Sequence, residues 1–143
     1  MNVEVTLADQ ITITIDGNDY VAKFPHVGEE VRIEALKELY SNKTYSSLLQ
    51  NLTKSSQRVL DIVDMMAYFT VMIPDLQEDL DVKNVKTFND LPQIKAIPLV
   101  NAYKQQLRPW LDDWYTLLGK LENPKEEDKF SIDETQVGES DQS

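Results

Sequence analysis

The chain has 143 residues, of which 41% are hydrophobic, and this length and composition suit one domain with a single core. The formal net charge is −11 at pH 7 and no cluster of Lys and Arg stands out, so we expect neither nucleic-acid binding nor attachment to an anionic membrane. The chain has no cysteine, which excludes disulfides, a thiol nucleophile and cysteine-based metal sites.

No stretch of the chain has the character of a membrane anchor or a leader. The longest apolar run lies around Met65–Ile73, far short of the ~20 residues that a membrane-spanning helix needs. The first residues, MNVEVTLADQ, contain neither the basic nor the apolar region of a secretory signal. We therefore expect a soluble protein of the cytoplasm that has no membrane partner.

Residues 11–24 predict a β-hairpin. Ile11–Ile15 alternates branched apolar and small polar residues, and a second short strand is expected over Asp19–Phe24. Between them, Gly17-Asn18 at the centre of a four-residue turn suits a tight loop with positive φ. Because two strands alone are marginally stable in water, the isoleucine face must pack on helices or on another chain's sheet.

A helical body is expected over residues 29–122. In its first helix, Glu29–Ser41, one apolar stripe at helical spacing is expected to be buried. That stripe consists of Val31, Ala35, Leu36, Leu39 and Tyr40. A short amphipathic turn follows at Leu48–Leu52, and Ser55 or Ser56 can cap the next helix.

The next helix, Ser56–Ile73, becomes apolar nearly all round from Met65 onward. Such a helix lies at the centre of a core or is covered by a partner. Both alternatives stay open for Met65, Met66, Tyr68 and Phe69, because methionine packs readily against different surfaces. These four residues are candidates for partner binding.

The C-terminal part of the body contains several prolines. Asp75–Asp90 is expected to form a short helical turn and then a loop, and Pro98 suits the first position of a helix that runs to about Gln106. A bend is expected near Pro109. Aromatic and leucine residues then form a long stripe: Tyr103, Leu107, Trp110, Leu111, Trp114, Leu117, Leu118 and Leu121. Its Tyr103, Trp110 and Trp114 are further partner-binding candidates, with core packing as the alternative.

Residues 123–143 are expected to be a disordered acidic tail. From Glu122 onward the chain has eight acidic and two basic residues, a net charge of −6, and few apolar groups to offset the cost of ordering. The predicted organisation is therefore one domain over 1–122 followed by this tail. The predicted fold class is α+β and mainly α, with an N-terminal hairpin and a small bundle of four to five helices.

Residues that could carry chemistry are few. His26 is the only histidine, it follows a proline in an expected loop, and we interpret it as a surface residue. Asp61 and Asp64 lie one turn apart and could act as an acid pair if both were buried, with a solvated helix face as the alternative. We expect no catalytic residue, no metal site and no cofactor, and hence no enzyme.

Taken together, the hairpin Ile11–Phe24, the helical segments Val31–Tyr40 and Val59–Ile73, the small size, the acidity and the charged C-terminus resemble the tail assembly chaperones of long-tailed bacteriophages. The resemblance is one of architecture over most of the chain, and no functional residue transfers with it. It implies a non-catalytic protein of the host cell cytoplasm that binds and solubilises the tape measure protein while tail tube subunits polymerise around it. It also implies that a longer form is made by ribosomal frameshifting.

Two other interpretations stay open. The chain could be a structural subunit of a virion head, neck or tail, in which the hairpin joins a neighbour's sheet and the protein self-associates. It could also be a small acidic regulatory protein whose tail mimics nucleic acid. A small enzyme that uses Asp61 and Asp64 is a third hypothesis.

Overall fold

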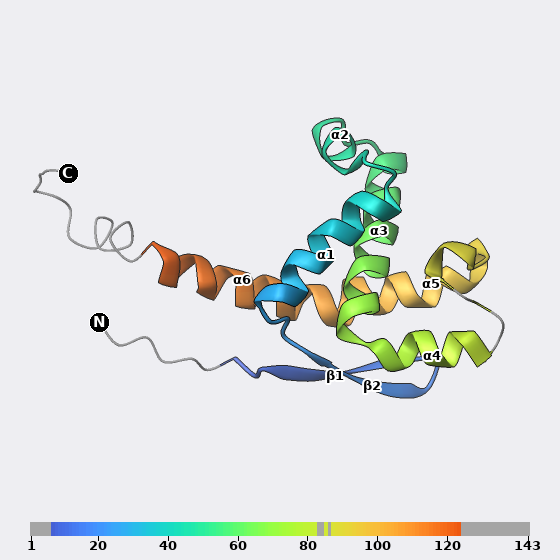
Figure 1. The fold of residues 1–143 in the computed structure, drawn as a ribbon, viewed down its shortest axis with the longest axis horizontal. Coiled ribbons are helices and arrows are strands. Elements are labelled where there is room, and N and C mark those ends of the chain that lie inside the picture. The colour runs from blue at the N-terminus through green and yellow to red at the C-terminus, as the bar shows by residue number, and fades with distance from the viewer. Residues whose placement is uncertain (1–6, 83–84, 86, 124–143) are drawn as a thin grey trace, which may run out of the picture. The chain divides into compact units, whose positions relative to one another are not determined.

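The computed structural model describes residues 7–82, 85 and 87–123 (Figure 1). Its contacts divide the chain into two units, residues 8–109 and residues 1–7 with 110–143, and each is described by itself. The larger unit begins with a two-stranded antiparallel hairpin and continues as helices. The predicted α+β, mainly helical fold is therefore confirmed, while one domain over 1–122 stays a prediction.

The hairpin consists of β1 (Gln10–Ile15) and β2 (Asn18–Lys23), with Ile15 opposite Asn18. Its two-residue turn is Asp16-Gly17, at φ 50° and 81°, and the predicted centre at Gly17-Asn18 is wrong by one residue. The turn needs positive φ at both central positions, whereas Asn18 already pairs in β2. One face of the hairpin is buried through Ile13, Ile15, Tyr20 and Ala22.

Three helices follow: α1 (Val27–Tyr40), α2 (Tyr45–Gln50) and α3 (Lys54–Met72). Thr53, and neither Ser55 nor Ser56, caps α3, because its hydroxyl accepts a hydrogen bond from the Ser56 N–H at 3.1 Å. The Ser56 hydroxyl in turn accepts from the Thr53 N–H at 2.7 Å, so the two residues form a reciprocal cap.

The predicted buried stripe of α1 is wrong in part. Ile33 is the buried residue of this helix, whereas Val31 and Leu39 are each 66% exposed and Ala35 is exposed too. The side of the helix that faces α3 contains Ile33 together with Leu36 and Tyr40 of the predicted stripe, and the Tyr40 hydroxyl lies 3.2 Å from the Thr70 hydroxyl. The apolar residues of α1 cover more of the helix surface than α3 can bury, so the sequence pattern did not show which of them are in contact.

The core of the larger unit is built around α3. Its C-terminal half is buried from Met65 to Phe69, and α4 (Pro74–Val82) follows after Ile73. The Tyr20 hydroxyl donates to Asp79 of α4 at 2.7 Å and so links the hairpin to this helix. Where one helical turn and a loop were expected, the chain forms the nine-residue α4 and the 3-10 turn η1 (Phe88–Asp90).

The last helical run consists of α5 (Gln93–Ala102), the π-helical turn η2 (Tyr103–Leu107) and α6 (Arg108–Glu122). Pro98 lies inside α5 and not at its first position, because the N–H groups of Lys95 and Ala96 already bond to the Pro92 carbonyl. The π-helical turn η2 lies just before Pro109, where we expected a bend. A proline ring clashes with the carbonyl four residues earlier, and a π turn relieves that crowding.

In the smaller unit, the structure describes Leu7 and residues 110–123, most of which belong to α6. The expected disordered tail lies outside the described residues from 124 onward. No helix among the described residues is long and apolar enough to cross a membrane.

Candidate functional site

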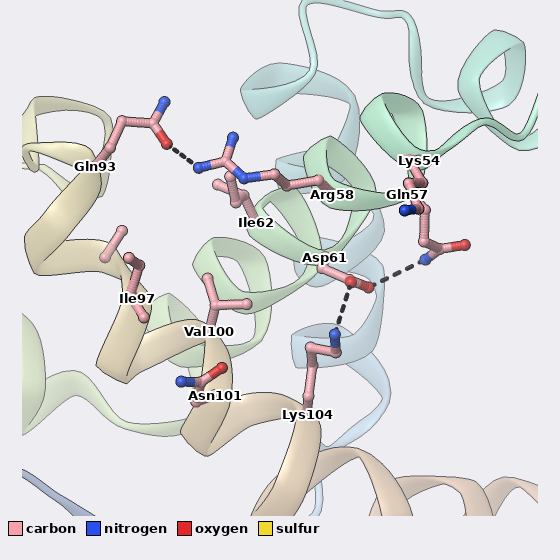
Figure 2. Close-up of a pocket in the computed structure, with 11 residues that line it drawn as sticks. Lys54, Gln57, Arg58, Asp61, Ile62, Gln93, Ile97, Val100, Asn101 and Lys104 are labelled. Carbon is pink, nitrogen blue, oxygen red and sulfur yellow. Dashed lines mark hydrogen bonds and ion pairs between the residues drawn. The ribbon is translucent and has the colours of Figure 1, made fainter.

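A groove of about 350 Å³ lies between the N-terminal half of α3 and the run of α5 and η2 (Figure 2). The α3 side contributes Lys54, Gln57, Arg58, Asp61 and Ile62. The opposite side contributes Gln93, Ala96, Ile97, Val100, Asn101 and Lys104. All of these residues belong to the larger unit, so its own packing fixes the geometry of the groove.

Part of the groove wall is apolar. Ile62 of α3 faces Ile97 and Val100 of α5, and the spacing of the last two by three residues places them on one side of their helix. Ile97 is 51% exposed, although isoleucine is a residue that cores usually bury. The groove therefore holds apolar surface that no described part of the chain covers.

The same groove is also lined by positively charged side chains. Lys54 and Arg58 are exposed side chains one turn apart on α3, and Arg58 donates a hydrogen bond to the neutral amide of Gln93 (Figure 2). No carboxylate among the described residues forms an ion pair with Lys54 or Arg58. In a chain of net charge −11, the groove is thus a local site of uncompensated positive charge.

Asp61, the acidic residue that lines the groove, is 5% exposed and fully engaged. Its Oδ1 accepts from Arg108 at 2.7 Å and from Gln57 at 3.1 Å, and its Oδ2 lies 3.3 Å from Lys104 Nζ. Burial alone would raise the pKa of this carboxyl, but the hydrogen bonds from Arg108 and Gln57 outweigh it and hold the pKa below its ordinary value. Asp61 is an ionised structural anchor.

Asp64 has a different environment from Asp61, although it lies only one turn further along α3. It does not line the groove, and it accepts a hydrogen bond from the Tyr45 hydroxyl of α2 at 2.6 Å. Burial raises the pKa of the Asp64 carboxyl, and burial together with the bond to Asp64 raises the pKa of Tyr45. The solvated helix face that we considered for this pair is wrong for Asp61, which is buried, whereas Asp64 is half-buried. Each carboxylate ties α3 to a different helix.

The π turn η2 holds the groove in place. Lys104 and the adjoining Arg108 bond to Asp61, while the Tyr103 ring stacks on Tyr68 with 5.7 Å between ring centroids. The Arg108 guanidinium lies 4.9 Å from the centroid of the Tyr103 ring. The contacts of this one irregular turn fix the distance between α3 and α5, and thereby the width of the groove.

The structure places the predicted partner-binding residues elsewhere. Five of them, each at most 7% exposed, fill the core of the larger unit: Met65, Met66, Tyr68, Phe69 and Tyr103. Their burial agrees with core packing, the alternative that the sequence left open for these residues. A partner could reach them only after the helices separate. Trp110 and Trp114 are half-buried residues of α6 in the smaller unit.

Apart from Asp61, sequence reasoning missed the groove residues, although a signal was present. Lys54, Arg58 and Asp61 follow one another at i, i+4 and i+7, which places them along one side of α3. Ile97, Val100 and Lys104 lie at i, i+3 and i+7 on the facing helical run, which is also a helical spacing. Nothing in either segment alone shows that these two sides face each other.

The remaining candidate residues do not form a site. His26 is 90% exposed, as expected, and its backbone N–H donates to Glu29 Oε1 at 2.8 Å at the start of α1. Within the described ranges, no three acidic or histidine side chains are grouped so that they could hold a metal ion.

Comparisons with protein-family models, with curated proteins and with solved structures find no match to this chain.

Proposed function

We propose that the protein is a non-catalytic client-binding protein whose groove between α3 and α5 receives an amphipathic helix with acidic residues beside its apolar face. One observation carries the proposal. Ile97 of α5 is left half exposed in the same groove as Lys54 and Arg58 of α3, two cationic side chains that pair with no described carboxylate, in a chain of net charge −11.

The dimensions of the groove fit this mode of binding. A volume of about 350 Å³ receives a few inserted side chains and not a whole helix. A client helix would lie across the opening and insert residues at i, i+3 and i+4, the pattern by which helices dock in grooves. The apolar walls supply affinity, and Lys54 and Arg58 select the acidic partner and set its orientation.

The charge distribution favours binding of a specific partner over non-specific binding of other proteins. With a net charge of −11, the chain as a whole repels other acidic proteins, which opposes non-specific association. The groove carries the opposite sign through Lys54 and Arg58, so an acidic client is attracted there. Asp61 contributes no catalytic acid or base in this proposal, because its oxygens are occupied by Arg108, Gln57 and Lys104.

The resemblance to phage tail assembly chaperones suggests the client. A tape measure protein is long, helical and apolar, and it must stay soluble until the tail tube surrounds it. In this proposal the protein binds successive amphipathic segments of such a client in the host cytoplasm. Shielding of the apolar faces by an acidic carrier would then oppose aggregation of the client.

A photo-crosslinking experiment tests this proposal in the cells that make the protein. Benzoylphenylalanine replaces Ile97 in the groove, and the matched control carries it at Ile94, which is on the same helix, 74% exposed and outside the groove. We expect position 97 to capture a long helical client through an acidic amphipathic segment, and position 94 to capture it much less. Equal capture at both positions would contradict the proposal, and capture of only tail shell or head proteins would favour the structural-subunit interpretation.

A further inference from the structure

The outer edge of β2 offers backbone groups for pairing. In a two-residue hairpin closed by Ile15 and Asn18, hydrogen-bonded pairs alternate with pairs whose polar groups point outward. The bond from the Phe24 N–H to the Asp9 carbonyl, 2.9 Å, continues the same alternation. For Asp19, Val21 and Lys23, the outward-pointing residues, the N–H donates to no described residue and the C=O accepts from none.

The opposite edge of the hairpin is closed at one point. The side-chain amide of Gln106 donates to the Thr14 carbonyl and accepts from the Thr14 N–H, both at 2.8 Å. These are the two bonds that a neighbouring strand would make at this residue. A further strand therefore meets a competitor on β1 but none from the described residues on β2.

We propose that β2 pairs antiparallel with β2 of a second copy, with Val21 opposite Val21 and Asp19 opposite Lys23. In this register all three outward-pointing residues of each strand pair, giving about six backbone hydrogen bonds. A shift by two residues in either direction, to the next register that pairs outward-pointing residues, loses one of these pairs. The β2 edges of two copies are thus most complementary in this one register.

The side chains favour the same register. Asp19, Val21 and Lys23 lie on the exposed face of the hairpin, and Val21 is 51% exposed. Pairing places a carboxylate of each copy opposite an ammonium of the other on both sides of a valine pair, and opposite charges across strands are stabilising. On the other face, Tyr20 lies opposite the small Ala22 of the second copy.

The resulting association closes at two copies. The pairing is two-fold symmetric and uses the same edge of both chains, so it leaves no β2 edge for a third. A closed dimer differs from the open polymer or ring of a virion subunit, and it does not involve the groove. The inference is therefore independent of the proposed client.

Variants in which the charge of Asp19 or of Lys23 is reversed test whether this dimer forms. Sedimentation velocity of the full chain is expected to show a concentration-dependent dimer for the wild type and monomers for Asp19→Lys and for Lys23→Asp, since each variant places like charges opposite each other. Mixing the two variants is expected to restore dimers, because every cross-strand pair then has opposite charges. A wild type that stays monomeric at all concentrations, or variants that fail to combine, would overturn the proposal.

A proline pair supplies the matched control. Val21 and Thr12 lie opposite each other in the hairpin, and both point their N–H groups outward, but to opposite edges. Val21→Pro is expected to abolish the dimer and Thr12→Pro to keep it, with circular dichroism confirming that both variants fold. Loss of the dimer in both, or in neither, would overturn the assignment to the β2 edge.

Discussion

Gln106 pairs with the backbone of Thr14 through both ends of its side-chain amide, across 92 residues of sequence. The donor and the acceptor lie 2.8 Å from the Thr14 carbonyl and N–H, so one side chain satisfies the backbone groups of a strand edge. The amide reaches this position from the π turn η2, whose neighbouring residues bond to Asp61. One irregular turn thus supports both the hairpin and the groove.

Replacement of Gln106 should open this edge. Gln106→Leu removes both bonds to Thr14, and we expect it to lower the free energy of unfolding by about 1–2 kcal/mol. With both hairpin edges then exposed, association should continue beyond the dimer, because open strand edges template further pairing. Sedimentation and urea unfolding measure the two effects. The exposed neighbour Gln105→Leu is the control, and identical behaviour of the two variants would refute the edge-blocking role.

Asp61→Asn should be among the more destabilising single substitutions at a polar residue. It leaves Arg108 and Lys104 without their buried counter-charge, so we expect a loss of about 2 kcal/mol or more in urea unfolding at pH 7. The folded pKa of Asp61 is lowered, so its contribution is complete above the unfolded pKa and should be lost as the pH falls below about 4. The exposed Asp112→Asn should change stability by less than about 0.5 kcal/mol. Equal effects at the two positions would show that Asp61 is not an anchor.

Asp64→Asn should have the opposite pH dependence. Burial raises the folded pKa of this carboxyl, so its contribution to stability is present below the unfolded pKa and is lost as the pH rises through the folded pKa. The asparagine variant does not undergo this loss. Its stability relative to the wild type should therefore increase from about pH 4 toward neutrality, as unfolding curves at a series of pH values would show. A difference that stays constant, or that decreases with pH, would contradict the raised pKa.

Local patterns were sufficient to predict much of the fold. Alternating isoleucines predicted β1, and the apolar run through Met65 and Phe69 predicted the central helix, because these signals lie within one element. The turn was misplaced by one residue, since both Asp16-Gly17 and Gly17-Asn18 suit positive φ and only strand register distinguishes them. The buried side of α1 was mistaken because its apolar residues span more than one face.

The groove could not be predicted because it depends on contacts between distant segments. Arg108 lies 47 residues after Asp61, and only the folded chain shows that they pair. Ile97 looks like a core residue in the sequence, and its exposure follows from how α5 meets α3. The sequence suggested the large aromatic and methionine residues as partner contacts, yet Phe69 and Tyr103 are buried in the core.

Binding of the client segment to groove variants tests the central claim most directly. The segment captured at position 97 would be synthesised as a peptide, and its affinity measured by fluorescence anisotropy for the wild type, for Lys54→Glu/Arg58→Glu and for Lys95→Glu. Lys95 is an exposed residue of α5 that does not line the groove, so its replacement controls for a charge reversal outside the groove. We predict that charge reversal in the groove weakens binding by about tenfold or more, and that Lys95→Glu changes it by less than about twofold. Equal affinities for all three proteins would contradict the assignment of the groove as the client site.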